Sequence, residues 1–509
     1  MKHSYLWLLA LLLSLSSCSS FEKYRGLYHD MLGQADLEGA SRLIEKKKFY
    51  KKDRNQVLYY LELGALARLQ GDLQQSNEHL NQADLLIEDR RASVGAQGLA
   101  VVSNPRVLPY QTEYFENVAV HYQKSLNYLQ LNNLEGARVE ARRMNIRLQA
   151  LNDAVPDKPL KYRDDVLGHL MMGLSYEMNG EWNNAFIAYR NAANLFLQDG
   201  KLGPYMGTPM PEQLKCDLIR MAEANGFKGE AERYRKALKP RCREQEGEGG
   251  SLVLFWENGQ GPIKEEQIIG FNIFRQGDAH QVRFVNQKSG LEYDYGQEVY
   301  DEFNGFAGLS NISVALPYFQ RRNTPLQWAQ VKYHGGLSKM EPVEDFNVIA
   351  EQSLRDRFVR ELGSALLRLA AKKAVEAGLR TIKTKKQDSE EADGEDGAEK
   401  KKSEEKEEEY DETLGIVLSG AMSIVNAATE RADIRSWQSL PAQIHYQRIP
   451  LKKGFNNISI TFFNQYNQRM EEANLRLNGN GRLQVSSLAT PGLHALSPSA
   501  HPTTKPIQP

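Results

Sequence analysis

The segment LMMGLSYEMNGEWNNAFIAYRNA, Leu170 to Ala192, decides the fold, because a similar segment, LELGALARLQGDLQQSNEHLNQA, occurs at Leu61 to Ala83. Small and apolar residues recur at matching places in the two segments. The shared positions are Leu63, Gly64, Ala67, Gly71, Leu73, Ser76, Leu80 and Ala83 in one copy, and Met172, Gly173, Tyr176, Gly180, Trp182, Ala185, Tyr189 and Ala192 in the other. Such internal repetition is typical of a solenoid, in which stacked units bury a common core.

Two weaker copies extend the pattern along the N-terminal half. SLNYLQLNNLEGARVEARRM matches at Ser125, Tyr128, Asn132, Leu134, Ala137, Ala141 and Met144, and LIRMAEANGFKGEAERYRKAL matches at Ile219, Ala222, Gly226, Ala231 and Leu238. The pattern resembles that of tetratricopeptide repeats (TPRs), which are helical hairpins. Small residues are needed where the two helices cross closely, and Gly or Asn is needed at the turn, where the backbone is left-handed.

The turns are farther apart than the ~34 residues of a regular TPR array, so the repeat contains insertions. The predicted turn residues are Gly71, Asn132, Gly180 and Gly226. The largest insertion runs from Arg90 to Glu116 and contains Tyr110, Tyr114 and Phe115. These aromatic residues either form a lid over the concave face of the solenoid or pack against its helices, and we favour packing.

One repeat segment, EGARVEARRMNIRL, is rich in charge. Its charged residues include Arg138, Glu140, Arg142, Arg143 and Arg147. They either present a basic strip to an anionic partner, such as a polysaccharide or a lipid headgroup, or form a solvated helix face. We favour the solvated face, where Glu–Arg pairs at helical spacing contribute only tenths of a kcal/mol.

The period of the sequence changes at Ser251, where short runs rich in β-branched and aromatic residues begin. SLVLFWENGQG, IIGFNIFRQ, HQVRFVN, NISVALPYFQ and WAQVKYHGG are separated by Gly, Asn and Asp, and QIHYQRIPLKKGFNNISITFFNQ adds two strands near the C-terminus. Short strands with regular turn signals predict a β-sandwich. The fold class is therefore α+β and multidomain, with an N-terminal TPR-like α-solenoid followed by a β-sandwich-like domain that carries a helical insertion.

The insertion has two helical segments and a charged tract between them. Leu354, Phe358, Leu362, Leu366 and Leu369 have helical spacing. The apolar segment 414–428 is too short to cross a bilayer unaided. It either dips into a membrane or oligomerises, or it forms one arm of a helical hairpin buried on the sandwich, which we favour. The tract 383–410 lacks aliphatic residues larger than alanine, so we expect it to be disordered.

These patterns divide the chain into six parts. We predict a signal peptide at 1–17, a TPR-like helical domain at 18–245, a β-rich domain at 250–345 plus 440–485, a helical insertion at 346–382 and 411–435, a disordered linker at 383–410 and a disordered tail at 486–509.

The N-terminus carries a short apolar run that ends at a cysteine. Leu6 to Leu15 is about half the ~20 residues of a membrane-spanning helix and follows a short basic start, as in a secretory signal. The order Leu15-Ser16-Ser17-Cys18 resembles the lipobox of bacterial lipoproteins, in which the cysteine is acylated and becomes the first residue. The resemblance implies a membrane anchor at Cys18, and Ser19 favours the outer membrane, facing the periplasm. An ordinary cleaved signal is the alternative.

Only Cys216 and Cys242 remain once Cys18 is set aside. An exported protein can oxidise its thiols, so these two residues either form a disulfide or stay as buried free thiols. Two cysteines alone do not make a metal site.

Three blocks of the sequence resemble a family of bacterial lipoproteins with N-terminal TPRs and a β-rich C-terminal half, a family without an assigned activity. The blocks are EYFENVAVHYQKSLNYLQLNNLEGARVEARR, SLVLFWENGQGPIK and ERADIRSWQSLPAQIHYQRIPL. The resemblance covers most of the chain after Cys18, except the charged tract and the tail. It implies the fold and the location, and it brings no catalytic or ligand residue.

The sequence offers no recognisable catalytic motif. It lacks the G-x-S-x-G, H-E-x-x-H and P-loop patterns, its ten histidines are scattered, and a formal net charge of -1 disfavours nucleic acid as a partner. In RADIRSWQSLP, Arg435 and Trp437 either cap a pocket or, as we favour, brace the end of the helical insertion against the sandwich. We expect no metal and no cofactor.

We therefore expect a non-enzymatic scaffold whose concave face holds an envelope protein, in assembly, export or peptidoglycan regulation. The alternative is an envelope enzyme that acts on glycan through two carboxylates of the C-terminal half.

Overall fold

The computed structural model describes residues 19–93, 105–153, 160–198, 201–242, 247–276, 280–288, 291–296, 301, 310–358, 361–366, 368–369 and 431–496. Several predictions concern residues outside these ranges. They are the signal peptide, lipidation at Cys18, the charged linker 383–410, the apolar segment 414–428 and the end of the tail.

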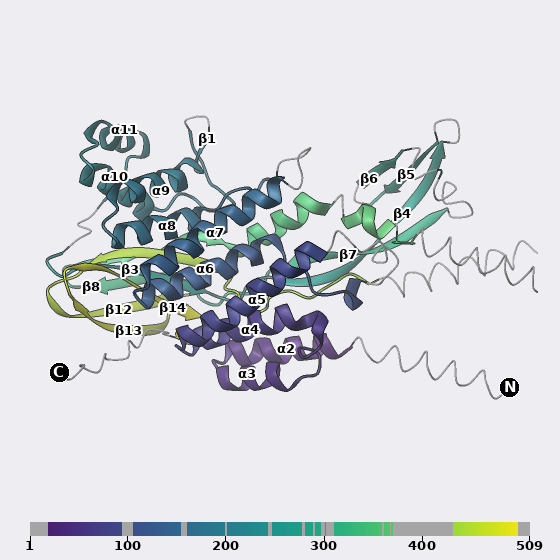
Figure 1. The fold of residues 1–509 in the computed structure, drawn as a ribbon, viewed down its shortest axis with the longest axis horizontal. Helices are drawn as coiled ribbons and strands as arrows, with labels where there is room; N and C mark the ends of the chain where they lie inside the picture. Colours follow the sequence, from purple (N-terminus) through teal and green to yellow (C-terminus); the bar gives the residue numbers. More distant parts are fainter. Residues whose placement is uncertain are drawn as a thin grey trace, which may run out of the picture.

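Ten helices of the described chain form five consecutive antiparallel hairpins (Figure 1). The hairpins are α2 (Ser19–Gly33) with α3 (Leu37–Lys46), α4 (Gln56–Leu69) with α5 (Leu73–Ser93), α6 (Tyr114–Gln130) with α7 (Leu134–Asp153), α8 (Val166–Met178) with α9 (Trp182–Asn194), and α10 (Glu212–Ala224) with α11 (Lys228–Leu238). Each hairpin packs on the next, so the N-terminal half is a helical solenoid.

The turns of these hairpins share one backbone conformation. The φ angles are positive at Gly71 (89°), Asn132 (56°), Gly180 (74°) and Gly226 (74°), the four residues that the sequence indicates as turns. Glycine adopts a positive φ without the steric cost that a Cβ brings, and Asn tolerates it better than most residues. The residue types at these positions therefore determine where the chain reverses between the two helices of each hairpin.

The two helices of the best-matched hairpins approach closely at a glycine. A Cβ added to Gly64 would lie 2.7 Å from Leu80 Cγ, and one added to Gly173 would lie 2.5 Å from Tyr189 Cε1. Both distances are too short for real carbon atoms. A glycine seven residues before the turn is therefore required by the packing of the partner helix.

The first hairpin, α2 with α3, is not predicted by the sequence pattern. Its turn residue Ala35 has a φ of 61°. Tyr28 stands seven residues before this turn, in the place of Gly64 and Gly173 in the other hairpins. The sequence pattern misses this copy of the repeat because a large residue occupies the small-residue position and an alanine occupies the turn.

The described strands of the C-terminal half form three four-stranded sheets. The central sheet has the order β10 (Glu341–Asp345), β11 (Gln443–Pro450), β3 (Gly250–Asn258) and β14 (Arg482–Thr490). The outer sheet has the order β13 (Arg469–Gly479), β12 (Gly454–Phe463), β8 (Trp328–Tyr333) and β9 (Gly336–Lys339). The arm sheet has the order β6 (Leu291–Tyr295), β5 (Gln281–Asn286), β4 (Ile263–Gln276) and β7 (Asn311–Gln320). β1 (Leu197–Gln198) and β2 (Lys201–Leu202) form a small ribbon beside α9.

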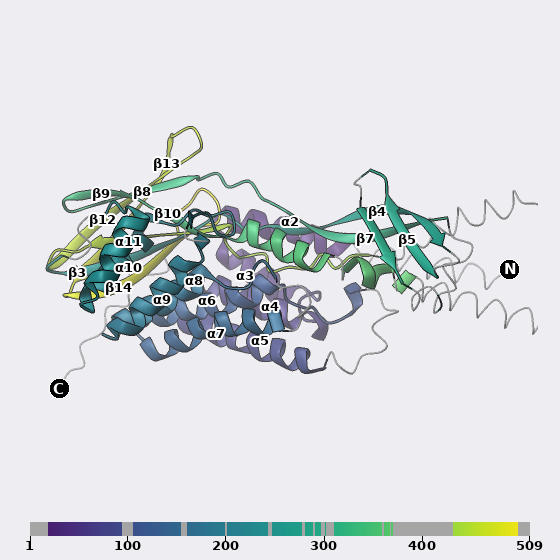
Figure 2. The same cartoon turned by 90° about the horizontal axis from the view of Figure 1, so that it is seen from above.

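The central sheet is buried on both faces. Along β3, Leu252, Leu254 and Trp256 contribute to a core shared with the outer sheet, whereas Val253 and Phe255 belong to the core of the helices. Figure 2 shows the resulting layers, with the helices on one side and the strands of the outer sheet on the other. The alternation of side chains along one strand thus joins the helical half and the β half in a single packed body.

The arm sheet projects at the end opposite the outer sheet in both views (Figures 1 and 2). It has its own small core, in which Phe271, Phe284 and Val314 pack against Leu362 and Leu366 of the helical residues 361–366. The sequence pattern predicts one sandwich for these strands and gives no sign of a separate sheet, because each strand by itself has the same local pattern.

Two predicted boundaries are wrong. Residues 486–490, assigned to a disordered tail, belong to β14, which pairs in parallel with β3 along its whole length. The polar sequence there is buried, and Ser487 bonds to Arg68 and Gln130 of the helices. Residues 431–435, assigned to the helical insertion, are extended, and their backbone groups bond to side chains rather than to a helix.

We expect Gly173→Ala to lower the free energy of unfolding by about 1–3 kcal/mol, because the added methyl group displaces Tyr189. Gly229→Ala in α11 is the matched control, since nothing lies within 4 Å of the place that its added Cβ would take. Urea unfolding followed by circular dichroism measures both. Equal stability of the two variants would contradict the close crossing at Gly173.

Candidate functional site: the inner face of the helical repeat

The first helix of every hairpin faces the β half. We call this surface of α2, α4, α6, α8 and α10 the inner face. It corresponds to the concave face where the sequence predicts a partner protein. In the structure this face is covered by the chain's own central sheet and by residues 431–441, which we call the strap. The chemistry of the site is therefore that of an internal interface.

One ionic contact joins α4 to β3. The guanidinium of Arg68 pairs with the carboxylate of Glu257, and both side chains are buried. Tyr122 Oη on α6 donates to Glu257 Oε1 at 3.1 Å, and Arg68 Nη2 donates to Ser487 Oγ of β14 at 3.0 Å. Gln130 of α6 adds a bond to the same hydroxyl at 2.7 Å. Two adjacent parallel strands are thus fixed to two helices by one cluster.

A second cluster joins α8 and α10 to β11. Arg448 Nη2 lies 2.8 Å from Glu177 Oε2, and Arg448 Nε lies 2.8 Å from Asp217 Oδ1. Arg220 pairs with both carboxylates, at 2.7 and 3.1 Å. Burial by itself raises the pKa of Glu177, but Arg448 and Arg220 outweigh it and lower this pKa to about 2. Two guanidinium groups therefore balance two carboxylates in a site closed to water.

The strap crosses α4 and α6 and is held through its backbone. Trp437 N–H donates to Glu116 Oε1 at 2.7 Å, and Gln438 N–H donates to Glu62 Oε1 at 2.7 Å. Ser439 Oγ donates to Glu62 Oε2 at 2.6 Å. Glutamates on two neighbouring first helices thus bind the backbone of the strap.

Arg435 and Trp437 brace the strap and do not cap a pocket. Arg435 Nη1 donates to Asn55 Oδ1 at 2.7 Å, and its Nη2 donates to the carbonyl of Leu108 at 3.0 Å. Trp437 is buried in the core of the helices. The motif is used for packing, but it braces the chain against the helical repeat rather than against the sandwich.

Burial raises the pKa values of Glu62 and Glu116, the two glutamates that bind the strap. Desolvation raises the pKa of Glu62 to about 7 against the hydrogen bonds that it accepts. Desolvation, with the neighbouring charge of Glu113, also raises the pKa of Glu116 to about 7. Glu113 itself is buried, but Arg357 and Lys264 pair with it and lower its pKa to about 2.

The described part of the insertion Arg90 to Glu116 and the arginines of α7 both contact other parts of the helical repeat. Tyr110 and Phe115 are buried, and Tyr110 Oη donates to Glu116 Oε2 at 2.5 Å. On α7, Arg143 and Arg147 each lie 3.1 Å from Asp84 of α5, and Arg138 lies 3.0 Å from Glu181. Arg142 bonds to the hydroxyl of Tyr176. The described part of the insertion lies on the solenoid, and these arginines are engaged within the repeat.

One group in the described chain has metal-ligand geometry. Ligand atoms of Asp84, His121 and Glu140 lie within 4.8 Å of one another. Lys124 Nζ lies 3.1 Å from Asp84 Oδ2 and 3.0 Å from Glu140 Oε2, so a buried ammonium already supplies the positive charge between the carboxylates. The group is best described as an ion-pair cluster between α5, α6 and α7.

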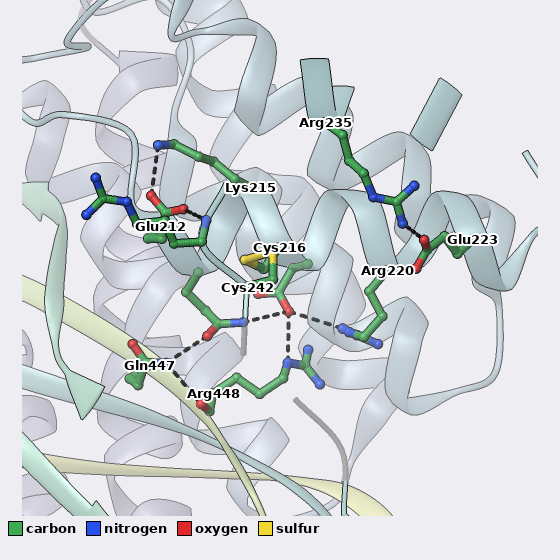
Figure 3. Close-up of a disulfide and its surroundings, with 12 residues drawn as sticks. Glu212, Lys215, Cys216, Arg220, Glu223, Arg235, Cys242, Gln447 and Arg448 are labelled. Carbon is green, nitrogen blue, oxygen red and sulfur yellow. Dashed lines mark hydrogen bonds and ion pairs between the residues drawn. A yellow bond between two sulfur atoms is a disulfide. The ribbon is translucent and has the colours of Figure 1, made fainter. Parts of the chain in front are cut away.

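Cys216 of α10 and Cys242, beyond α11, form a disulfide with their Cα atoms 5.5 Å apart (Figure 3). Beside it is a cavity of about 350 Å³ that contains Glu212, Arg241, Lys339 and Glu341. Glu341 Oε2 accepts from the backbone N–H of Glu212 at 2.5 Å, and Glu212 Oε2 accepts from Lys215 at 2.9 Å. Burial and the charge of Glu212 raise the pKa of Glu341.

None of the inner-face residues was predicted as a site from the sequence. The signal that could have revealed them is an isolated charge between apolar residues, as with Glu62 and Arg68 in LELGALARL, Glu257 in SLVLFWEN and Arg448 in IHYQRIP. Such a residue is buried only when a partner compensates it, so each implies a contact elsewhere in the chain.

Comparisons with known proteins find similar chains among solved structures alone. No family model matches the chain, and no curated protein matches it significantly in sequence. Among solved structures, MamA is similar at 20% identity over 41% of this chain and 91% of its own, with a TM-score of 0.26. A putative kinesin light chain from Podospora anserina, with nearly identical TPR-like repeats, is similar at 15% identity over 43% of this chain and 92% of its own, with a TM-score of 0.28. Within the described residues, no helix is long and apolar enough to cross a membrane.

We expect Arg448→Met to lower the free energy of unfolding by about 3–5 kcal/mol, because it leaves two buried carboxylates with one guanidinium. Arg233→Met is the control, since Arg233 forms an exposed pair with Glu230 and its loss costs about 1 kcal/mol or less. Urea unfolding measures both variants. A loss below about 1 kcal/mol for Arg448→Met would contradict the role of this cluster.

The pKa of Glu62 also predicts how stability depends on pH. Its value rises from an ordinary 4.5 to about 7 in the folded chain, so the folded state binds the proton more tightly. The contribution of Glu62 to the free energy of unfolding is therefore fully present below pH 4.5. It is lost as the pH rises through 7, and the total loss is about 3 kcal/mol. His29 and His445, whose pKa values burial lowers to about 3, act in the opposite direction. The readout is therefore the stability of the wild type relative to Glu62→Gln, which should fall by about 3 kcal/mol across this window in urea unfolding.

Two comparisons isolate this effect. Glu38→Gln, at an exposed pair on α3, should leave the slope unchanged. Glu113 and Glu177, whose pKa values are lowered, contribute above pH 4.5 and lose their effect only as the pH falls further. A difference in stability between wild type and Glu62→Gln that does not change between pH 4.5 and 7 would contradict the assignment.

Proposed function

We propose that the protein is a non-enzymatic scaffold of the bacterial cell envelope that binds a partner protein on the outside of its helical repeat. In this proposal a lipid on Cys18 anchors it to the outer membrane, facing the periplasm. The process that it serves is envelope assembly, export or regulation of peptidoglycan synthesis. The lipobox-like sequence supports the anchor, because two or more acyl chains hold a protein stably at a membrane without a spanning helix.

The observation that carries the proposal is the covered inner face. The buried clusters of Arg68 with Glu257 and of Arg448 with Glu177 commit the peptide-binding side of the repeat to the chain's own strands. The repeat is therefore a rigid framework, and a partner must bind elsewhere. The second helices face outward, and α7 exposes Val139 (42%) and Ile146 (53%), seven residues apart on one side of the helix.

Site-specific photo-crosslinking in intact cells tests this proposal. A crosslinker at Ile146 on the outside should capture a partner protein, whereas one at Gln130, which contacts Ser487 on the inner face, should react only within the chain. The same cells carrying Cys18→Ser should lose the protein from the membrane fraction and lose the crosslink at Ile146.

Three results would contradict the proposal. Capture of a partner at Gln130 would mean that the inner face opens in cells. Normal membrane fractionation of Cys18→Ser would remove the lipid anchor. Recovery of no partner, together with glycan turnover by the purified chain, would favour an enzyme.

The cavity beside the disulfide supports the second candidate, an enzyme that acts on glycan. Glu212 and Glu341 converge there, and glycoside hydrolysis needs a protonated and an ionised carboxyl group. Both carboxylates already accept backbone N–H groups, from Arg241 and Glu212 respectively, which makes them structural. Glycan turnover that is abolished by Glu341→Gln would establish this candidate instead.

A further inference from the structure

The exposed face of the outer sheet carries a regular strip of side chains on β12. Phe455, Asn457, Ser459, Thr461 and Phe463 alternate with Ile458, Ile460 and Phe462, which belong to the core beneath. The strip therefore has an aromatic residue at each end and an amide and two hydroxyls between them. At the ~3.4 Å rise of an antiparallel strand it is about 27 Å long.

The two aromatic ends differ in exposure. Phe455 is 83% exposed, which is the largest exposure among the described large apolar residues. At the other end Phe463 stacks on Trp328 of β8, with ring centroids 3.9 Å apart and planes 6° from parallel. The ring of Phe455 is therefore largely open to water, whereas at the other end Phe463 and Lys339 lie over Trp328, so the Phe455 end marks a binding surface.

A groove of about 560 Å³ follows the Phe455 half of the strip. It exists because the neighbouring strand is shorter: β8 pairs with β12 only from Ser459 to Phe463, whereas β12 continues back to Gly454. Its lining includes Phe455, Asn457, Ser459, Thr461, Asn474 and Lys332. The floor is thus a row of neutral hydrogen-bonding groups with a ring at one end.

The polar groups of this groove contrast with those of the inner face. On the inner face the carboxylates and guanidinium groups are paired. In the groove the side chains of Asn457, Ser459, Thr461 and Asn474 form no hydrogen bond with any described residue. Amides and hydroxyls each offer donors and acceptors, so the row can bond to a ligand that carries many hydroxyl groups.

The charge of the groove is positive. Lys332 and Lys452 form no ion pair with the described residues, whereas Arg469 and Glu472 neutralise each other. Lys339, on the neighbouring strand β9, lies over the ring of Trp328 at 5.4 Å. The surface therefore complements a ligand that carries negative charge as well as hydroxyl groups.

We propose that this groove binds an acidic polysaccharide chain. The C–H face of a sugar ring stacks on Phe455. The hydroxyl groups of the polysaccharide bond to Asn457, Ser459, Thr461 and Asn474, and its carboxylates pair with Lys332 and Lys452. This inference goes beyond the proposed function, because it places a second, non-protein ligand on the opposite side of the central sheet from the helices.

Other classes of ligand fit less well. A peptide would add to the edge of β12 that β8 leaves unpaired before Ser459, and it would leave the polar row on the sheet face without partners. A nucleic acid requires many cations along its backbone, and the groove has two lysines without an ion pair among the described residues, in a chain of net charge -1.

The experiment titrates the full chain with an alginate hexasaccharide, a chain of uronic acids, by isothermal calorimetry. Phe455→Ala and Lys332→Gln should each weaken binding about fivefold or more. Phe274→Ala is the matched control, because Phe274 is a 51% exposed phenylalanine on the arm sheet, and it should change the affinity by less than about twofold. All three variants alter exposed side chains, so the fold is retained.

Three further probes separate the ligand classes. Cellohexaose, which is neutral, should bind more weakly than alginate, and hexaglutamate and a single-stranded oligonucleotide should bind more weakly still. The proposal is overturned if the wild type does not bind alginate, if hexaglutamate or the oligonucleotide binds as tightly, or if Phe455→Ala has no effect. None of these results bears on the crosslink at Ile146, so failure here is distinguishable from failure of the scaffold proposal.

Discussion

The buried pairing of Arg448 with Glu177 and Asp217, together with that of Arg68 with Glu257, is the constraint on which the rest of the structure depends. Charges removed from water are tolerated only when their partners lie at hydrogen-bonding distance. Each pair joins a first helix of the repeat to a strand of the central sheet, 271, 231 and 189 residues apart in the chain. A shift of either layer would leave these groups buried and unpaired, so the clusters admit one arrangement of helices and sheet.

This constraint changes how the repeat is used. In a solenoid that binds peptides, the first helices present open side chains to a partner. Here Glu62 and Glu116 bind the backbone of the chain's own strap in the same manner. The first helices thus bind a segment of the chain's own C-terminal half. Surfaces for other molecules are left on the outer helices, on the arm sheet and on the exposed face of the outer sheet.

Local sequence patterns predicted what is decided locally. The left-handed turns at Gly71, Asn132, Gly180 and Gly226 follow from residue type, and so do the helices beside them. The hairpin at Ala35 was missed because Tyr28 replaces a small residue. The separate arm sheet and the buried β14 depend on pairing between distant strands, which no local pattern encodes. The inner-face clusters were missed for the same reason, although single charges in apolar runs, such as Glu257, point to them.

The parallel pairing of β3 with β14 has a consequence for the order of folding. β3 lies between β11 and β14, and both of these strands come much later in the chain, from Gln443 onward. Contacts of such long separation form slowly, because a large loop must close before they contribute. In a chain that is still being synthesised, the inner charges of the helices therefore lack their strand partners. Residues 431–496 act as the closing step, and a truncation that removes them exposes β3, a strand buried along almost its whole length.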